Sequence, residues 1–342
     1  MYKLVRPLLF IFNPESIHGI AIGFIKTLGK LPVVSHRLHK YFTVENKNLR
    51  KEVLGISFPN PVGFAAGFDK NARVYNELKT FGFGFAEIGT VTPKPQPGNP
   101  KPRCFRLPAD KALINRMGFN NDGLEAVTRR LKKRNRNIIL GGNIGKNTAT
   151  PDEKAVDDYL ECFKGLYDYV DYFTVNVSCP NVDNLRKLQT GGELETILKA
   201  IVEERRYRDA YKPVLLKISP DLTDEQTDDM LYIVRETGVD GIVAVNTTVT
   251  RKGLKTSERK IADAGKGGLG GAPLTERTLE VIKYIRDQTS GQIPIIGVGG
   301  IMTPEDAQRM LDAGASLIQI YTGYVYNGPG FVRQILKHIK IV

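Results

Sequence analysis

Residues 213–247 have the sequence PVLLKISPDLTDEQTDDMLYIVRETGVDGIVAVNT. Two short apolar runs, Pro213–Ile218 and Gly241–Val245, flank the segment Asp224–Thr237, whose apolar residues repeat with helical spacing. This order predicts a strand, a helix and a second strand. Because strands that alternate with helices pair in parallel, the stretch predicts one unit of an α/β protein with a parallel sheet.

The same alternation continues over most of the chain. Further periodic helical segments occupy Glu193–Arg206, Thr275–Gln288 and Thr303–Ala313. Eight units over roughly 260 residues predict a (β/α)8 TIM barrel. An open doubly wound sheet is the alternative, but no GxGxxG follows the first strand, which disfavours its dinucleotide-binding form. The eight predicted strands are Val62–Ala66, Phe85–Val91, Ile138–Asn143, Tyr172–Val177, Pro213–Ile218, Gly241–Val245, Pro294–Val298 and Ser316–Ile320.

The composition of the 342 residues, 41% hydrophobic and 25% charged, is typical of a folded globular protein. The longest apolar run, Leu8–Phe12, is far shorter than the ~20 residues of a spanning helix, which excludes an integral membrane protein. Cys104, Cys162 and Cys179 form no CxxC pair, which disfavours a disulfide framework or a cysteine zinc site and fits a reducing compartment. Since residues 13–15 (NPE) follow the apolar run, we expect no secretory signal.

The net charge of +12 is compatible with an anionic ligand, an anionic membrane surface or nucleic acid. The strongest basic cluster, residues 129–136 (RRLKKRNR), lies near a predicted helix end, where cations complement the helix dipole. No zinc-finger spacing or aromatic RNA-binding motif accompanies it. We therefore interpret it as a solvated helix end and expect no nucleic-acid partner.

Residues 1–45 are predicted to form a separate helical hairpin before a barrel of residues 46–342. Asn13 can cap a helix that has Pro14 in its first turn and ends at Gly29, and an apolar segment lies upstream. The hairpin has more apolar surface than it can bury within itself. It either packs wholly on the barrel or provides a membrane-surface or lipophilic-ligand site. Its apolar stripe is Ile17, Ile20, Ala21, Phe24, Ile25 and Leu28.

The chemistry of such a barrel lies at the carboxyl ends of its strands. In this chain those ends supply amides, hydroxyls and two lysines, with few carboxylates and no histidine. Two-carboxylate hydrolysis and a histidine-carboxylate metal site are therefore disfavoured, and we expect no metal. Glycines at 267–271, 299–300 and 323 suit a phosphate group, because main-chain N–H groups can bind an anion there.

Two connections between the predicted strands are long insertions, residues 92–137 and 246–293. Five asparagines, each able to donate and accept hydrogen bonds, occur at the strand ends or in the first long insertion. Such a set suits a planar heterocycle with amide-like edges. The residues themselves thus predict a phosphate-containing cofactor and a small polar heterocycle, with redox or proton-transfer chemistry. The five are Asn115, Asn143, Asn176, Asn181 and Asn246.

These segments resemble the signature motifs of the dihydroorotate dehydrogenases, from about residue 55 to the end of the chain. The N-terminal hairpin, with Pro14, Glu15 and His18, resembles the extension of the membrane-associated, quinone-linked class 2 of that family. The motifs are FAAGFDK (64–70), NRMGFNN (115–121), NVSCPN (176–181), KISPDL (217–222), NTT (246–248), GGL (267–269), GVGG (297–300) and YT (321–322).

The resemblance implies an FMN-dependent enzyme that oxidises dihydroorotate to orotate in pyrimidine synthesis. It places His18 and Arg106 in a quinone site. It implies FMN contacts by Ala66, Gly67, Phe68, Asp69, Lys70, Thr90, Asn143, Asn176, Lys217, Val245, Gly271, Gly300, Tyr321 and Thr322. It implies substrate contacts by Lys70, Asn115, Arg116, Met117, Gly118, Phe119, Asn176, Asn181, Asn246 and Thr247.

Two positions depart from the class 2 pattern. Val245 stands where the family usually has a threonine against the flavin, so a hydroxyl contact would be lost there and a main-chain contact kept. Cys179 occupies the position of the catalytic base, where class 2 enzymes usually have serine and class 1 enzymes cysteine. A thiol has an ordinary pKa of about 8.5, so it ionises more readily than an alcohol.

The N-terminal extension indicates class 2 and Cys179 indicates class 1. The extension is a whole structural element, whereas cysteine differs from serine by a single atom, so we give the extension more weight and expect a class 2 enzyme. We further expect a monomer that lies peripherally on the cytoplasmic face of the cell membrane and uses a membrane quinone. The alternative is a class 1 enzyme that uses fumarate or NAD. A flavin-free phosphate-binding isomerase and a non-catalytic interaction protein are further alternatives.

Overall fold

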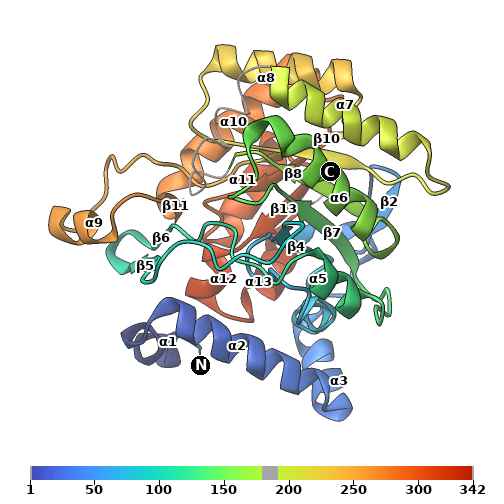
Figure 1. The fold of residues 1–342 in the computed structure, drawn as a ribbon. Helices are drawn as coiled ribbons and strands as arrows, with labels where there is room; N and C mark the ends of the chain where they lie inside the picture. The colour runs from blue at the N-terminus through green and yellow to red at the C-terminus, as the bar shows by residue number, and fades with distance from the viewer. Residues whose placement is uncertain (1, 179–191, 341–342) are drawn as a thin grey trace.

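The computed structural model describes residues 2–178 and 192–340. Eight parallel strands form a closed barrel, which confirms the predicted fold, and helices surround it (Figure 1). Each predicted strand is present, with bounds shifted by at most two residues. Around the barrel the strands are β3 (Val62–Phe64), β4 (Phe85–Val91), β7 (Ile139–Ile144), β8 (Tyr172–Asn176), β9 (Val214–Ile218), β10 (Gly241–Ala244), β12 (Ile295–Val298) and β13 (Leu317–Ile320).

The predicted outer helices are also present. Thr223 and Thr303 each form a capping box, which explains where α8 and α11 begin. Their buried faces, and those of their neighbours, pack on the apolar outer side of the strands. The helices after the N-terminal region are α4 (Tyr75–Leu78), α5 (Leu124–Leu131), α6 (Ala155–Leu166), α7 (Gly192–Arg206), α8 (Asp224–Thr237), α9 (Glu258–Ala264), α10 (Thr275–Gln288), α11 (Pro304–Ala313), α12 (Thr322–Asn327) and α13 (Phe331–His338).

The amino end of the barrel is closed by a hairpin of β1 (Lys51–Val53) and β2 (Ile56–Phe58). Its Val53 and Phe58 join an apolar cluster with Phe85, Tyr172 and Leu317, side chains of the barrel strands. Apolar side chains thus fill the barrel interior at this end, and we expect the ligand site at the carboxyl ends of the strands.

The two long insertions meet in a small antiparallel sheet that was not predicted. It consists of β5 (Cys104–Leu107), β6 (Ala112–Asn115) and β11 (Gly268–Gly271), with β6 in the centre. Gly268 pairs with Asn115, so the first insertion is held against the second. The remaining short 3-10 turns are η1 (Lys47–Leu49), η2 (Lys79–Phe81), η3 (Pro108–Asp110), η4 (Asp152–Lys154), η5 (Tyr167–Tyr169) and η7 (Ala272–Leu274).

The N-terminal region contains three helices, not the two of the predicted hairpin. They are α1 (Tyr2–Ile11), α2 (Pro14–Gly29) and α3 (Pro32–Phe42), and they lie together on one side of the barrel (blue in Figure 1). The prediction for α2 is confirmed, because Asn13 Oδ1 accepts a hydrogen bond from the N–H of Glu15 at 2.9 Å. In the described residues no single helix is long and apolar enough to cross a membrane; only α2 and α3 together meet that test, and they are bent by 107°.

Candidate active site

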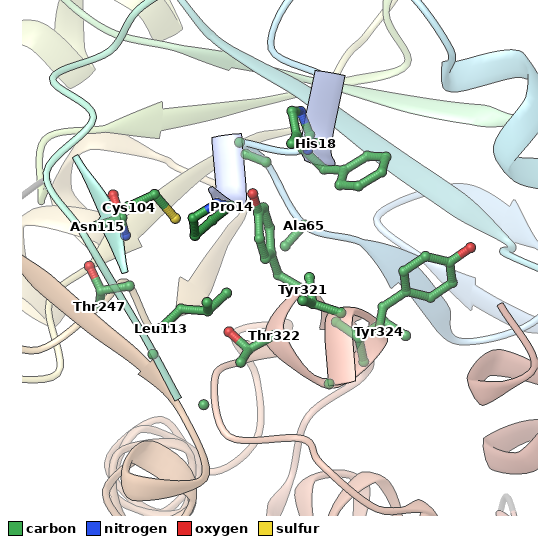
Figure 2. A pocket seen from close by; sticks show the side chains of 18 of the residues that line it. Pro14, His18, Ala65, Cys104, Leu113, Asn115, Thr247, Tyr321, Thr322 and Tyr324 are labelled. Atoms are coloured by element: carbon green, nitrogen blue, oxygen red, sulfur yellow. The ribbon is translucent and has the colours of Figure 1, made fainter. Parts of the chain in front are cut away.

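The carboxyl ends of the barrel strands open into a cavity of about 560 Å³. Strand ends, the β5-β6-β11 sheet and helix α2 all contribute to its wall. Figure 2 shows Tyr321 in the middle of this pocket, with Asn115 and Thr247 on one side and His18 on the other. The cavity therefore joins a half above the barrel to a half bordered by the N-terminal helices.

The strand ends of the barrel provide a buried network of amides and hydroxyls. Thr90 Oγ1 donates to Asn143 Oδ1 at 2.6 Å, and Asn176 Nδ2 donates to Thr90 Oγ1 at 3.0 Å. Asn246 Nδ2 donates to Ser178 Oγ at 3.0 Å and to Asn176 Oδ1 at 3.3 Å. These bonds fix Asn176 and Asn246, which line the cavity, so that both present oriented polar groups to a ligand.

Glycines from the end of β11, the turn after β12 and the first turn of α12 line the cavity. A Cβ at Gly300 would collide with the backbone of Thr275, and one at Gly271 with the carbonyl oxygen of Lys111. Both glycines also have positive φ angles, +76° and +111°. Because no side chain covers the backbone here, its N–H groups are open to an anion. The glycines that line the cavity here are Gly270, Gly271, Gly299, Gly300 and Gly323.

Two lysines give the cavity its cationic character. Lys70 Nζ donates to the carbonyl oxygen of Gly67 at 2.6 Å, and burial lowers the pKa of Lys70 to about 8. Lys217, on β9, is 6% exposed and also lines the cavity. An ammonium group in a buried site interacts favourably with a negative charge, so both side chains suit an anionic ligand.

The other half of the cavity is formed by α2 and the edge of β5. The His18 ring packs edge-on against Phe68 at 4.9 Å, and burial lowers the pKa of His18 to about 4, which keeps the imidazole neutral at neutral pH. Arg106 Nη1 donates to the carbonyl oxygen of Phe12 at 2.7 Å and thereby holds the end of α1. Apart from His18 and Glu15, the α2 side chains that line the cavity are apolar, namely Pro14, Ile17, Ile20, Ala21, Phe24 and Ile25.

Most of the predicted site residues lie on the wall of this one cavity. The predicted FMN residues found there are Ala66, Gly67, Phe68, Lys70, Thr90, Asn176, Lys217, Val245, Gly271, Gly300, Tyr321 and Thr322. The predicted substrate residues found there are Lys70, Asn115, Met117, Gly118, Phe119, Asn176, Asn246 and Thr247, and the predicted quinone residues are His18 and Arg106.

Three predicted residues lie behind the wall. The Asp69 carboxylate accepts hydrogen bonds from the N–H groups of Arg73 and Val74, both at 2.7 Å, and so shapes its own loop. The Arg116 side chain donates to the carbonyl oxygens of residues 102 and 264, so it is directed away from the cavity wall. Asn143 supports Thr90, as described above. The predicted base Cys179 and the predicted ligand Asn181 lie outside the described residues.

Several lining residues were not predicted from the sequence. Cys104 and Leu113 belong to β5 and β6, and Figure 2 shows Cys104 beside Asn115. Only the length of the first insertion pointed to them. Gln319 also lines the cavity, and here a signal was present, because it is the one polar residue of the strand segment LIQI.

Comparison with known proteins gives one consistent result. Residues 48–342 match the family model described as dihydroorotate dehydrogenase. A relative from Christiangramia forsetii named dihydroorotate dehydrogenase (quinone) is 52% identical over 340 residues, which is 99% of this chain and 98% of the relative. One of the same name from Idiomarina loihiensis is 44% identical over 99% of this chain and 100% of its own length. A crystal structure of DHODH from Eimeria tenella in complex with ferulenol superimposes with a TM-score of 0.85 at 36% identity, covering 98% of this chain and 93% of that one.

Proposed function

Since the chain belongs to the dihydroorotate dehydrogenase family, we propose that it oxidises dihydroorotate to orotate in pyrimidine synthesis with a quinone as electron acceptor. The observation on which the proposal depends most is the continuity of the cavity. It joins the strand-end amides to the apolar face of α2, so a polar ring and a lipophilic acceptor can both reach one redox group between them.

We propose FMN as that redox group. The cationic Lys217 and the bare main chain at Gly271 and Gly300 fit a phosphate, and the polar strand ends fit a ring with amide-like edges. The chemistry that bound FMN would supply is acceptance of a hydride and transfer of the electrons to a second acceptor. The residues of this chain that would hold it are Ala66, Gly67, Phe68, Lys70, Thr90, Asn176, Lys217, Val245, Gly271, Gly300, Tyr321 and Thr322, with Asp69 and Asn143 supporting them from behind.

At the substrate end, Asn115, Asn246 and Thr247 would hold dihydroorotate through its ring amides, and Lys70 would neutralise its carboxylate. These groups all line the cavity, with Asn115 and Thr247 on one side of it (Figure 2), and the bonds from Asn246 to Ser178 and Asn176 keep its amide in place. Such preorganisation lowers the barrier because the polar groups need not reorient during the reaction. Arg116, Met117, Gly118, Phe119 and Asn181 complete the proposed substrate set.

The proposed base is Cys179, which removes a proton from carbon 5 of the substrate. The residue directly follows Ser178, whose buried hydroxyl group is bonded to Asn246. Ser178 is the last residue that the structure describes before Cys179, and its bond to a proposed substrate amide supports the proposal. A cysteine at this position favours the class 1 alternative, in which fumarate or NAD is the acceptor.

At the opposite end, the neutral imidazole of His18 and the Arg106 guanidinium would hold the polar groups of the quinone. Every exposed leucine, isoleucine and phenylalanine of the described residues lies between residues 4 and 34, within or beside α1 to α3. Such a concentrated apolar surface is typical of membrane contact. We therefore propose that residues 1–45 bind to the cytoplasmic face of the cell membrane, that residues 46–342 form the catalytic domain, and that the protein acts as a monomer.

The test is the visible spectrum of the purified protein under anaerobic conditions. Dihydroorotate should bleach the flavin band near ~450 nm, and a quinone should restore it. A protein without flavin, or a band that dihydroorotate leaves unchanged, contradicts the proposal. Restoration by fumarate or NAD but not by quinone favours the class 1 alternative.

A further inference from the structure

A polar layer lies inside the barrel, directly beneath the cavity. Its centre is the carboxylate of Glu87, which is 2% exposed. Oε1 accepts a hydrogen bond from Asn143 Nδ2 at 2.8 Å, while Oε2 accepts from Thr174 Oγ1 at 3.1 Å, from Tyr172 Oη at 3.3 Å and from Gln319 Nε2 at 2.8 Å. Four donors thus surround a carboxylate that forms no ion pair within the described residues.

Gln319 connects this layer to the cavity. It is completely buried, lies on β13 two residues before Tyr321, and contributes to the cavity wall. Two residues earlier on the same strand, Leu317 packs in the apolar cluster that fills the bottom of the barrel. Because side chains two residues apart on a strand share a face, Gln319 stands between that apolar cluster and the ligand space.

The contacts of the Gln319 amide fix its orientation and leave its oxygen without a hydrogen-bond donor among the described residues. Its nitrogen donates to Glu87 and lies 3.5 Å from Tyr172 Oη, so turning the amide over would set its oxygen against the carboxylate. Oε1 is enclosed and meets no donor among the residues that the structure describes. An enclosed carbonyl oxygen without a donor is costly and therefore rare, so a group that enters the cavity must supply one.

We propose that Gln319 is a cofactor-positioning residue, whose Oε1 accepts a hydrogen bond from an N–H or O–H group of the bound flavin while Glu87 fixes its amide. The inference rests on the proposed function, because it assumes that the cavity binds FMN. It assigns a role to two residues outside the predicted site. The donor is either the ring N3–H or a ribityl hydroxyl group of FMN.

The experiment measures the dissociation constant of FMN for the flavin-stripped full-length protein by fluorescence quenching. Gln319→Met keeps the side-chain size and removes the acceptor, so FMN affinity should fall by about five- to tenfold. Tyr172→Phe is the matched control, because it removes one donor to Glu87 and leaves the Gln319 oxygen in place. It should keep the affinity within about twofold of wild type.

Flavin analogues then identify the donor. 3-Methyl-FMN lacks the ring N–H, and 2′-, 3′- and 4′-deoxy-FMN each lack one ribityl hydroxyl group. One of these should bind wild type more weakly than FMN does and should lose that penalty in Gln319→Met. If Gln319→Met does not fold, Gln319→Asn serves in its place, because it shortens the side chain by one methylene group and moves the amide oxygen away from the cavity.

The outcomes separate the inference from the function on which it rests. If wild type binds no FMN, the proposed function fails. If wild type binds FMN and the variant binds it equally well, or if every analogue has the same penalty in both proteins, Gln319 does not accept a hydrogen bond from the flavin and the inference is overturned.

Discussion

Arg103 donates hydrogen bonds to both carboxylate oxygens of Glu15, from Nε at 3.2 Å and from Nη2 at 2.7 Å. Its Nη1 donates to the carbonyl oxygens of Pro97 at 2.6 Å and Asn99 at 2.8 Å. The N–H of Asn99 in turn donates to the carbonyl oxygen of Met117 at 3.0 Å. One buried arginine therefore attaches the first turn of α2 to the segment that lines the substrate end of the cavity.

Glu15→Gln should loosen α2 and slow the quinone half-reaction selectively. A charge-assisted hydrogen bond to a largely buried arginine contributes about 1–2 kcal/mol, so the free energy of unfolding should fall by that order. Reoxidation of the flavin by quinone should slow several-fold, whereas its reduction by dihydroorotate should change little. Stopped-flow absorbance measures the two half-reactions separately.

The control is Lys101→Gln, because Lys101 is exposed and its Nζ lies 3.7 Å from Glu15, so its loss should be nearly silent. The hydrogen bond from Arg103 lowers the pKa of Glu15 below its ordinary value of 4.5. The stabilisation is therefore complete above about pH 4.5 and is lost as the pH falls below it. Melting temperatures of wild type and Glu15→Gln should converge as the pH falls from 4.5 through the lowered pKa of Glu15; a constant difference would contradict this role.

Lys70 should set an alkaline limit to substrate capture. Burial lowers its pKa to about 8, so in the enzyme without substrate the ammonium group is charged below pH 8 and becomes neutral above it. Only the charged form neutralises a substrate carboxylate. The kcat/KM for dihydroorotate should therefore decline above pH 8. Lys70→Arg should remove this alkaline decline, because a guanidinium stays charged, and an unchanged decline in that variant would exclude Lys70 as its source.

The fold was largely predictable because the sequence signals for its strands and helices lie within short stretches of the chain. Each barrel strand is a short apolar run, and Asn13, Thr223 and Thr303 mark helix starts through bonds to the next few residues. The β5-β6-β11 sheet was not predictable, because it pairs Gly268 with Asn115, two residues that lie far apart in the sequence. Helix α3 was missed because most of its residues are polar or exposed, and its one buried side chain, Phe42, packs on the distant Phe81.

The sequence indicated which residues lie near the cavity, but it did not indicate in which direction each side chain points. Strand ends converge in any such barrel, and Asn176, Lys217 and Asn246 accordingly line one cavity. Whether a side chain faces the ligand or its own loop depends on distant partners. Arg116 faces away because the carbonyl oxygen of Ala264 accepts its hydrogen bond, and no pattern around residue 116 encodes that contact.

Lys217→Ala and Asn246→Ala should separate cofactor from substrate binding. Lys217 is expected near the flavin, so its loss should weaken FMN retention about tenfold or more, since hydrogen bonds to charged groups are among the strongest. Asn246 is proposed to bind the substrate, so its loss should mainly raise the Michaelis constant for dihydroorotate. Asn143→Ala should affect both, because Asn143 supports Thr90 and Asn176. FMN titration and steady-state kinetics give the two readouts, and equal loss of FMN in all three variants would refute this division of roles.

Cys179→Ser should yield a folded, FMN-loaded enzyme that needs a higher pH to reduce its flavin. A thiol with an ordinary pKa of about 8.5 is partly ionised at neutral pH, whereas an alcohol needs a neighbouring group to accept its proton. Cys179→Ala should be slower still, with Cys162→Ser as a control for the loss of a thiol, since Cys162 is buried in the core. Flavin reduction by Cys179→Ala at the wild-type rate would remove Cys179 from the mechanism.

The exposed side chains of α1 offer a test of membrane binding that leaves the cavity intact. Leu4, Leu8 and Ile11 are 83%, 59% and 77% exposed, and none of them lines the cavity. Deleting the whole region to residue 44 is less informative, because it also removes Phe42 from its contact with Phe81.

The triple variant Leu4→Ser, Leu8→Ser, Ile11→Ser should bind anionic liposomes at least about tenfold more weakly, because each lost apolar side chain contributes on the order of 1 kcal/mol or more. Arg6 donates to the carbonyl oxygen of Tyr326 at 2.9 Å, so the salt-sensitive part of binding should come instead from the exposed Lys3, Lys26 and Lys30. Turnover with a short, soluble quinone should be unchanged, while turnover with a long-chain quinone in vesicles should fall in parallel with binding. Tyr232→Ser, on the exposed face of α8, controls for the loss of surface apolar area. If the triple variant still floats with liposomes as wild type does, α1 is not the membrane contact, and its apolar surface requires another partner.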